Sequence, residues 1–77
     1  MASLMENLVD VLEQECTMYE NLLGLSSQKT SIIIEGNLEA LAKITDEEQC
    51  VIGNIQSLEK KREEAMKDIA NVLNKDL

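Results

Sequence analysis

Apolar residues recur at alternating steps of three and four along two segments of this chain, and this spacing restricts the fold more than any other feature. The first segment runs from Leu4 to Ile33 and the second from Leu38 to Leu73. Because an α-helix has 3.6 residues per turn, this spacing gathers the apolar side chains into one stripe on a helix. The sequence therefore predicts an all-α protein with helices at about residues 4–34 and 38–74.

Capping signals mark the ends of both predicted helices. Ser3 followed by Glu6 is a capping-box pattern, which predicts a helix start near Leu4. Gly36 suits the left-handed residue that ends a helix, and Asn37 suits the N-cap of the next one. Since a turn at residues 35–37 is short, the two helices are predicted to be antiparallel neighbours. The expected fold is a long antiparallel two-helix hairpin that resembles a coiled coil.

Composition excludes several functions. The chain has no proline and only three glycines, which suits long helices, and its net charge is −8 from 15 acidic and 7 basic residues. Such a surface repels nucleic-acid phosphates and anionic lipid headgroups. The longest uninterrupted apolar runs have three residues, as at 32–34, and the N-terminus lacks the pattern of a signal peptide. We therefore expect a cytoplasmic protein that binds no nucleic acid and does not insert into membranes.

Residues for catalysis or metal binding are missing from the pattern. The chain has no histidine, so Cys16 and Cys50 lack the usual base partner of a nucleophilic thiol. It contains no phosphate-binding glycine loop and no metal-ligand spacing. We predict no catalytic, cofactor-binding or metal-binding residue, no small-molecule substrate and no enzymatic activity. The two cysteines lie eleven residues out of step in the register described next, so no disulfide is expected within the chain.

Charged residues interrupt the apolar stripes at four positions. Facing residues of an antiparallel hairpin have residue numbers with a constant sum. In three pairs of opposite charge the two residue numbers add up to 77: Glu15 with Arg62, Lys29 with Glu48, and Asp10 with Lys67. The first two of these pairs lie on the stripes. Charged residues at such positions often set the register between helices, at some cost in stability. Coincidence is the alternative, because 29% of the residues are charged and allow many pairings.

A second apolar row flanks each stripe. In the first helix it contains Met5, Val9, Leu12, Cys16, Tyr19, Leu23 and Ile33, and in the second Leu38, Ile52, Met66 and Leu73. A hairpin covers each helix on one side only, so these rows would expose more apolar surface than soluble monomers usually do. We expect a homodimer that forms a four-helix bundle. Four residues are predicted near the dimer or partner interface: Leu12, Leu23, Ile52 and Met66.

One further succession of residues spans almost the whole chain, at about residues 4–72. It comprises Leu8, Leu12, Glu15, Tyr19, Leu22, Leu23, Lys29 and Ile33, then Gly36-Asn37-Leu38-Glu39-Ala40-Leu41, Ile44, Glu48, Ile52, Ile55 and Leu58-Glu59-Lys60-Lys61-Arg62. This succession resembles the FlgN-type flagellar export chaperones. The resemblance implies a cytoplasmic chaperone that keeps hook-associated proteins, which join hook to filament, soluble and competent for flagellar type III export.

The chain departs from that family in length. Its members usually have a further C-terminal helical segment, which is associated with grasping the substrate, so this chain is either a fragment of a longer chaperone or a short relative that binds through its hairpin. We therefore assign no client-binding residue by resemblance. Met5, Met18 and Met66 either fill the core or adapt to client surfaces. The alternative function is a structural coiled-coil module that oligomerises or spaces other proteins and has no client.

Overall fold

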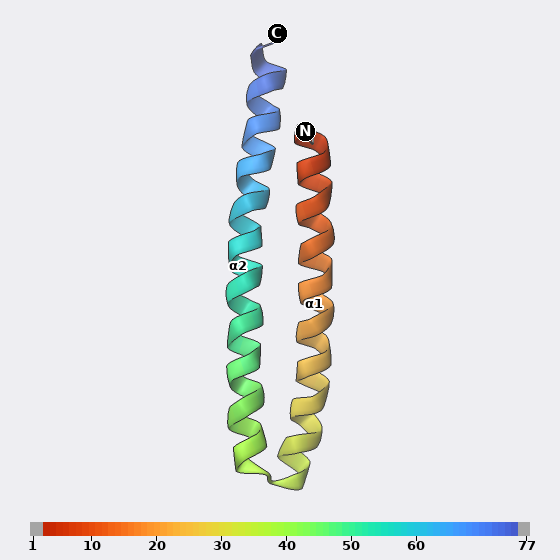
Figure 1. Ribbon diagram of the computed structural model, residues 1–77, viewed down its shortest axis with the longest axis vertical. Helices are drawn as coiled ribbons and strands as arrows, with labels where there is room; N and C mark the ends of the chain where they lie inside the picture. Colours follow the sequence, from red (N-terminus) through yellow and green to blue (C-terminus); the bar gives the residue numbers. More distant parts are fainter. Residues whose placement is uncertain (1–2, 76–77) are drawn as a thin grey trace.

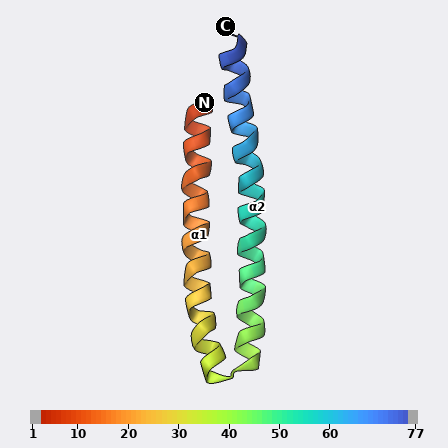
Figure 2. The same cartoon turned by 180° about the vertical axis from the view of Figure 1, so that it is seen from behind.

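The computed structural model describes residues 3–75 and contains two helices, α1 (Leu4–Glu35) and α2 (Leu38–Lys75). They lie side by side and run in opposite directions, and α2 extends past the N-terminus of α1 at the open end (Figures 1 and 2). The molecule measures 60 × 20 × 14 Å, and no strand occurs between residues 3 and 75. The prediction of an all-α antiparallel hairpin is confirmed.

Hydrogen bonds at the helix ends follow from the capping residues. The Ser3 hydroxyl accepts a hydrogen bond from the Glu6 amide at 3.1 Å and so satisfies a free donor of the first turn of α1. At the other end of α1, Gly36 has a φ of 71°, a left-handed conformation that costs little without a Cβ. Its amide donates to the carbonyls of Ile32 and Ile33 at 3.0 and 3.1 Å. These bonds give partners to two carbonyls of the last turn as the helix ends.

The next residue starts the second helix. Asn37 Oδ1 accepts a hydrogen bond from the Ala40 amide at 3.1 Å, and the Asn37 carbonyl accepts from the Leu41 amide at 3.0 Å. Glu39 lies in the first turn of α2, where its charge is favourable near the positive end of the helix dipole. Each helix ends one residue beyond the expected position, and the turn lies between them at residues 36–37.

The core of the hairpin is thin. Among the described residues only Ile44, Ile55 and Leu58 are buried hydrophobic residues, and all three belong to α2. The apolar residues of the α1 stripe that face them are only half-buried. Because stable domains usually bury their apolar faces between two packed layers, a single layer of two helices leaves much apolar surface open. Neither helix, within the described residues, has an apolar stretch long enough to cross a membrane.

Candidate functional site

Two ion pairs join the helices at the positions where charges interrupt the stripes. Lys29 Nζ lies 2.9 Å from Glu48 Oε1, and Arg62 Nη1 lies 3.0 Å from Glu15 Oε2. Both pairs therefore occur in the structure with the register in which facing residue numbers sum to 77. Burial of an ion pair costs desolvation energy, so these contacts are not by themselves evidence of a large gain in net stability.

The third expected pair, Asp10 with Lys67, is not formed, and that prediction was wrong. Asp10 instead accepts a hydrogen bond from Gln14 Nε2 of its own helix at 3.2 Å. Both Asp10 and Lys67 are exposed. Their positions on the helices point away from the seam, where water competes for the charges and an exposed pair gains little. Facing residue numbers therefore predict a contact only for residues on the stripes.

Glu15 is the one buried charged residue in the described part of the chain, with 4% of its surface exposed. Its Oε2 atom binds Arg62, whose side chain is 37% exposed, while its Oε1 atom is buried and has no hydrogen-bond partner. Close by, the Tyr19 hydroxyl donates a hydrogen bond to Glu59 Oε1 at 3.3 Å. We call Glu15, Tyr19, Glu59 and Arg62 the central polar cluster.

The surroundings of Tyr19 change its acidity. Loss of solvation by partial burial, the hydrogen bond to Glu59 and the negative charges of Glu59 and Glu15 raise the pKa of Tyr19 above its ordinary value of 10.0. The positive charge of Arg62 acts in the opposite direction. A raised pKa means that the folded chain holds the phenolic proton more tightly than the unfolded chain does. The stability that this contributes is present below pH 10 and is lost as the pH rises through the folded-state pKa.

Tyr19 is the only tyrosine, and the chain has no tryptophan, so absorbance near 295 nm reports its ionisation alone. We expect titration of the folded chain to give a pKa above 10.0, and titration in urea to give the ordinary value. Glu59→Gln should lower the folded-state pKa because it removes the closest negative charge. Glu47→Gln, which removes an exposed charge elsewhere on α2, is the control. Identical pKa values in the folded and urea-unfolded chain would contradict this account.

The Tyr19–Glu59 hydrogen bond also shows which flanking rows meet. Both residues belong to positions beside the stripes, and their contact places these positions of α1 and α2 on the same broad side of the hairpin. A hollow at the open end is lined by Met5 together with Leu73, which belong to the same two rows. The rows that were derived separately for each helix therefore form one continuous surface.

We call this surface the apolar side. It contains Met5, Val9, Leu12, Cys16, Tyr19, Leu23 and Ile33 of α1, and Leu38, Ile52, Met66 and Leu73 of α2. Of the residues expected near an interface, Leu12, Leu23 and Met66 are exposed, Leu23 by 72%, and Ile52 is half-buried. Of the three methionines considered for the core or for client contact, Met5 and Met66 lie exposed on this side, whereas Met18 is half-buried on the stripe of α1.

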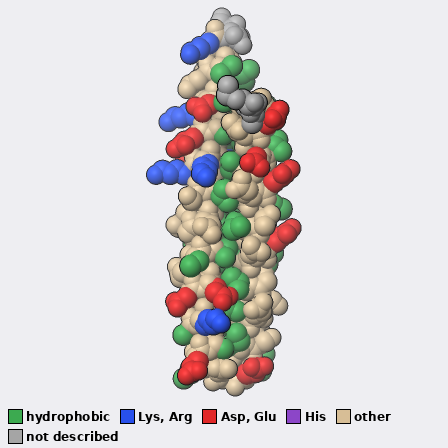
Figure 3. All heavy atoms as spheres, viewed as in Figure 1, with side chains coloured by type: hydrophobic (Ala, Val, Ile, Leu, Met, Phe, Trp, Pro, Cys, Tyr) green, Lys and Arg blue, Asp and Glu red, His purple; other side chains and the backbone are tan. Residues whose placement is uncertain are grey.

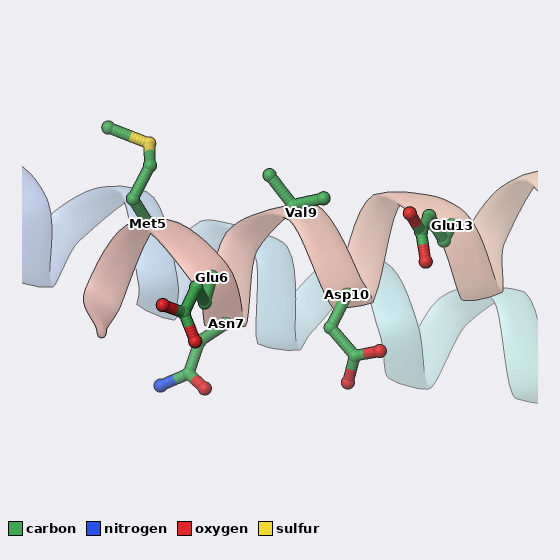
Figure 4. A pocket seen from close by; sticks show the side chains of 6 residues that line it. All are labelled: Met5, Glu6, Asn7, Val9, Asp10 and Glu13. Carbon is green, nitrogen blue, oxygen red and sulfur yellow. The ribbon is translucent and has the colours of Figure 1, made fainter. Parts of the chain in front are cut away.

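The opposite side is polar. Amide side chains recur there on α1 at every seventh residue, at Asn7, Gln14, Asn21 and Gln28. A shallow hollow on this side is lined by residues of both helices, with Leu25 and Val51 of the stripes at its floor and polar or small side chains around them: Glu20, Asn21, Gly24 and Gln28 of α1, and Glu47 and Cys50 of α2. Figure 4 shows the division near the start of α1, where Met5 and Val9 project to one side of the helix and Asn7 and Asp10 to the other. This division was not predicted from the sequence, although the seven-residue amide spacing indicates it.

Figure 3 views one broad side of the hairpin. Hydrophobic side chains are mostly confined there to a line between the two helices, and the outer edge of α1 carries acidic side chains. This is the appearance expected of the polar side. The acidic edge is consistent with Glu6, Glu13 and Glu20, which recur every seven residues on α1 and lie on its outer edge, between the apolar and the polar side.

The cysteines lie on different sides. Cys16 belongs to the apolar side and Cys50 lines the polar hollow, and both are exposed free thiols. The expected absence of a disulfide between them agrees with the structure. Within residues 3–75 no three acidic or cysteine side chains gather closely enough to hold a metal ion.

Comparison with known proteins gives a match to a protein family. A family model described as FlgN protein matches residues 1–77, which is the whole chain. No curated protein and no solved structure matches it. The matched range includes the residues 4–72 that carry the resemblance described above, together with both sides of the hairpin.

Proposed function

The chain belongs to the FlgN family, and from this premise we propose that it is a cytoplasmic binding protein of flagellar type III export and not an enzyme. In this role it keeps hook-associated proteins soluble and competent for export. The family membership supports a chaperone role in flagellar export. The identity of the clients as hook-associated proteins follows from the same membership as part of the proposal.

The observation that carries the proposal is the apolar side. Large hydrophobic side chains are exposed along both helices, among them Leu12, Leu23 and Met66. An amphipathic client helix would lay its apolar face on this surface, as helices do in hydrophobic grooves of other proteins. Covering the client's apolar stripe would prevent it from aggregating with other client molecules. Met5 and Met66 are flexible side chains that can adapt to more than one client surface.

Charge supports the same role. The net charge of −8 and the acidic edge formed by Glu6, Glu13 and Glu20 favour a client segment that is neutral or basic beside its apolar stripe. Complementary charge mainly raises the association rate and excludes wrong partners, whereas apolar contact supplies most of the affinity. The chain thus combines a hydrophobic docking surface with an electrostatic filter along one edge.

Sedimentation velocity tests the proposal. The chain, a purified hook-associated protein and their mixture would be compared at tens of micromolar. We expect the mixture to contain a complex that sediments faster than either component, and light scattering of the client to fall when the chain is present. A helical hairpin of unrelated sequence serves as the control. Absence of a complex with every hook-associated protein would contradict the proposed clients and would favour the structural coiled-coil module.

The same experiment tests self-association. Without a client, a second copy is the simplest cover for the apolar side, and twofold pairing of two hairpins would give a four-helix bundle. We expect the sedimentation coefficient of the chain alone to rise with concentration, and the dimer to disappear when the client binds. A thiol reagent should modify Cys16 more slowly in the dimer than in the monomer, whereas it should modify Cys50 at the same rate in both. A folded monomer at hundreds of micromolar would contradict the homodimer.

A further inference from the structure

The central polar cluster lies at the middle of the apolar side. Tyr19 is near the midpoint of α1, whose ends are Leu4 and Glu35. Apolar residues of the same rows flank it on both helices. Leu12 precedes Tyr19 by seven residues, and Met66 follows Glu59 by seven, so both lie about 10.5 Å away along the axis, towards the open end. The cluster thus lies between apolar residues of the apolar side, with Leu12 and Met66 towards the open end and Ile52 towards the turn.

The cluster carries more negative than positive charge. Its two carboxylates, Glu15 and Glu59, face a single guanidinium, that of Arg62. Arg62 Nη1 donates a hydrogen bond to Glu15 Oε2, and the Tyr19 hydroxyl donates one to Glu59 Oε1. Glu15 Oε1 is buried in a side chain that is only 4% exposed, and it has no partner in the described chain. A buried carboxylate oxygen without a donor is costly, so the cluster favours a partner that brings a positive charge.

We propose that the central polar cluster binds one cationic side chain, an arginine or lysine, that interrupts the apolar stripe of the client helix. This inference rests on the proposed function, because it specifies what the same surface recognises. Arginine is the better ligand, since its planar guanidinium carries five donors and can bind two carboxylates at once. The apolar rows provide most of the contact area with the client, and the cluster fixes the position of the client helix along the hairpin.

The geometry sets a pattern for the client. Leu12 and Met66 lie two helical turns from the cluster in one direction, and Ile52, seven residues before Glu59, lies two turns away in the other. A helix lying along the hairpin would match these contacts with apolar residues seven positions before and seven positions after its cation. A client with the cation alone would contact only the cluster, and a client with the apolar stripe alone would contact only the apolar residues on either side of it.

A second copy of the chain fits the cluster less well. Pairing about a twofold axis parallel to the helices would place two copies of the cluster at the same height. Each copy carries two carboxylates and one guanidinium, so the excess negative charge would double and would not be neutralised. Like charges brought together in an interface oppose association. A client with a central cation therefore displaces a second copy from this surface.

Two synthetic peptides provide the test. Both are amphipathic helices of about three heptads, fluorescently labelled, with leucines seven residues before and after a central position. One peptide carries arginine there, and the other carries citrulline, which has nearly the same shape without the charge. Fluorescence anisotropy would measure their binding to the wild-type chain. We expect the arginine peptide to bind about tenfold more tightly, as for one charge-assisted contact that excludes water.

Variants of matched charge locate the contact. Glu59→Gln should reduce the preference for arginine from about tenfold to about twofold. The reason is that the variant removes one of the two carboxylates that attract the guanidinium of the peptide. The new amide oxygen can still accept from Tyr19, so the helices should stay intact, as circular dichroism would show. Glu47→Gln, on the polar side, removes the same charge and should keep the full preference. If Glu59→Gln loses helicity, the comparison of the two peptides on the wild-type chain decides alone.

The outcomes separate this inference from the proposed function. Equal binding of the two peptides, no binding of the arginine peptide, or equal loss of preference in both glutamine variants would overturn it. Loss of peptide binding as the chain concentration rises would show a second copy as the stronger occupant and would also overturn it. If a hook-associated protein binds while the peptides show no preference, only the inference fails. If the preference is observed and no hook-associated protein binds, only the proposed function fails.

Discussion

Replacing Arg62 by methionine is expected to destabilise the hairpin by about 3 kcal/mol, because Glu15 would keep a buried charge without its partner. A single-layer hairpin with three buried hydrophobic residues has little stability to lose. Urea unfolding followed by circular dichroism at 222 nm would measure the change. Lys61→Met removes a neighbouring positive charge from an exposed position, and it should change stability by no more than about 0.5 kcal/mol.

Removing both partners should have the opposite effect. The double variant Glu15→Leu with Arg62→Met replaces the pair by apolar side chains, and such exchanges are often neutral or stabilising by about 1–4 kcal/mol. We expect it to be at least as stable as the wild-type chain. In that case the ion pair would align the two helices and form part of the central polar cluster, but it would not increase the free energy of unfolding. A cost below about 1 kcal/mol for Arg62→Met alone would contradict the view that Glu15 depends on this partner.

The path of the chain could be predicted from the sequence because its signals are local. Ser3, Gly36 and Asn37 each act through hydrogen bonds within a few residues, and all three have the conformation or contacts expected of caps. The two ion pairs could also be predicted, since a charged residue on an apolar stripe of a two-helix hairpin has few partners other than the one that faces it. Asp10 and Lys67 lie outside the stripes, where the same arithmetic has no physical basis.

Which flank of one helix joins which flank of the other could not be found from each helix separately. The pair that reveals it, Tyr19 with Glu59, has residue numbers that sum to 78. The unpaired Oε1 atom of Glu15 depends on side-chain geometry and has no signal in the sequence. The amide spacing through Asn7 and Gln14 was a usable sign, because a row of polar residues every seven positions marks the flank that carries no docking surface.

Leu23→Asp is expected to weaken client binding by about 100-fold. Leu23 is 72% exposed on the apolar side, so the substitution should leave the fold intact. A carboxylate at this position would lose its water when a client helix covers it, and it would replace an apolar contact of the kind that can contribute about 2 kcal/mol or more. Isothermal titration of a hook-associated protein into the wild-type and variant chains would measure the difference.

Asn21→Asp is the matched control for that variant. It adds the same charge to the same helix two residues away, but Asn21 lines the hollow on the polar side. If the apolar side is the docking surface, Asn21→Asp should change the affinity less than threefold, since an exposed charge away from the contact acts only through screened long-range forces. Equal loss in both variants would show that general repulsion by the acidic chain controls binding. A larger loss in Asn21→Asp would place the client on the amide row, and the assignment of the two sides would have to be reversed.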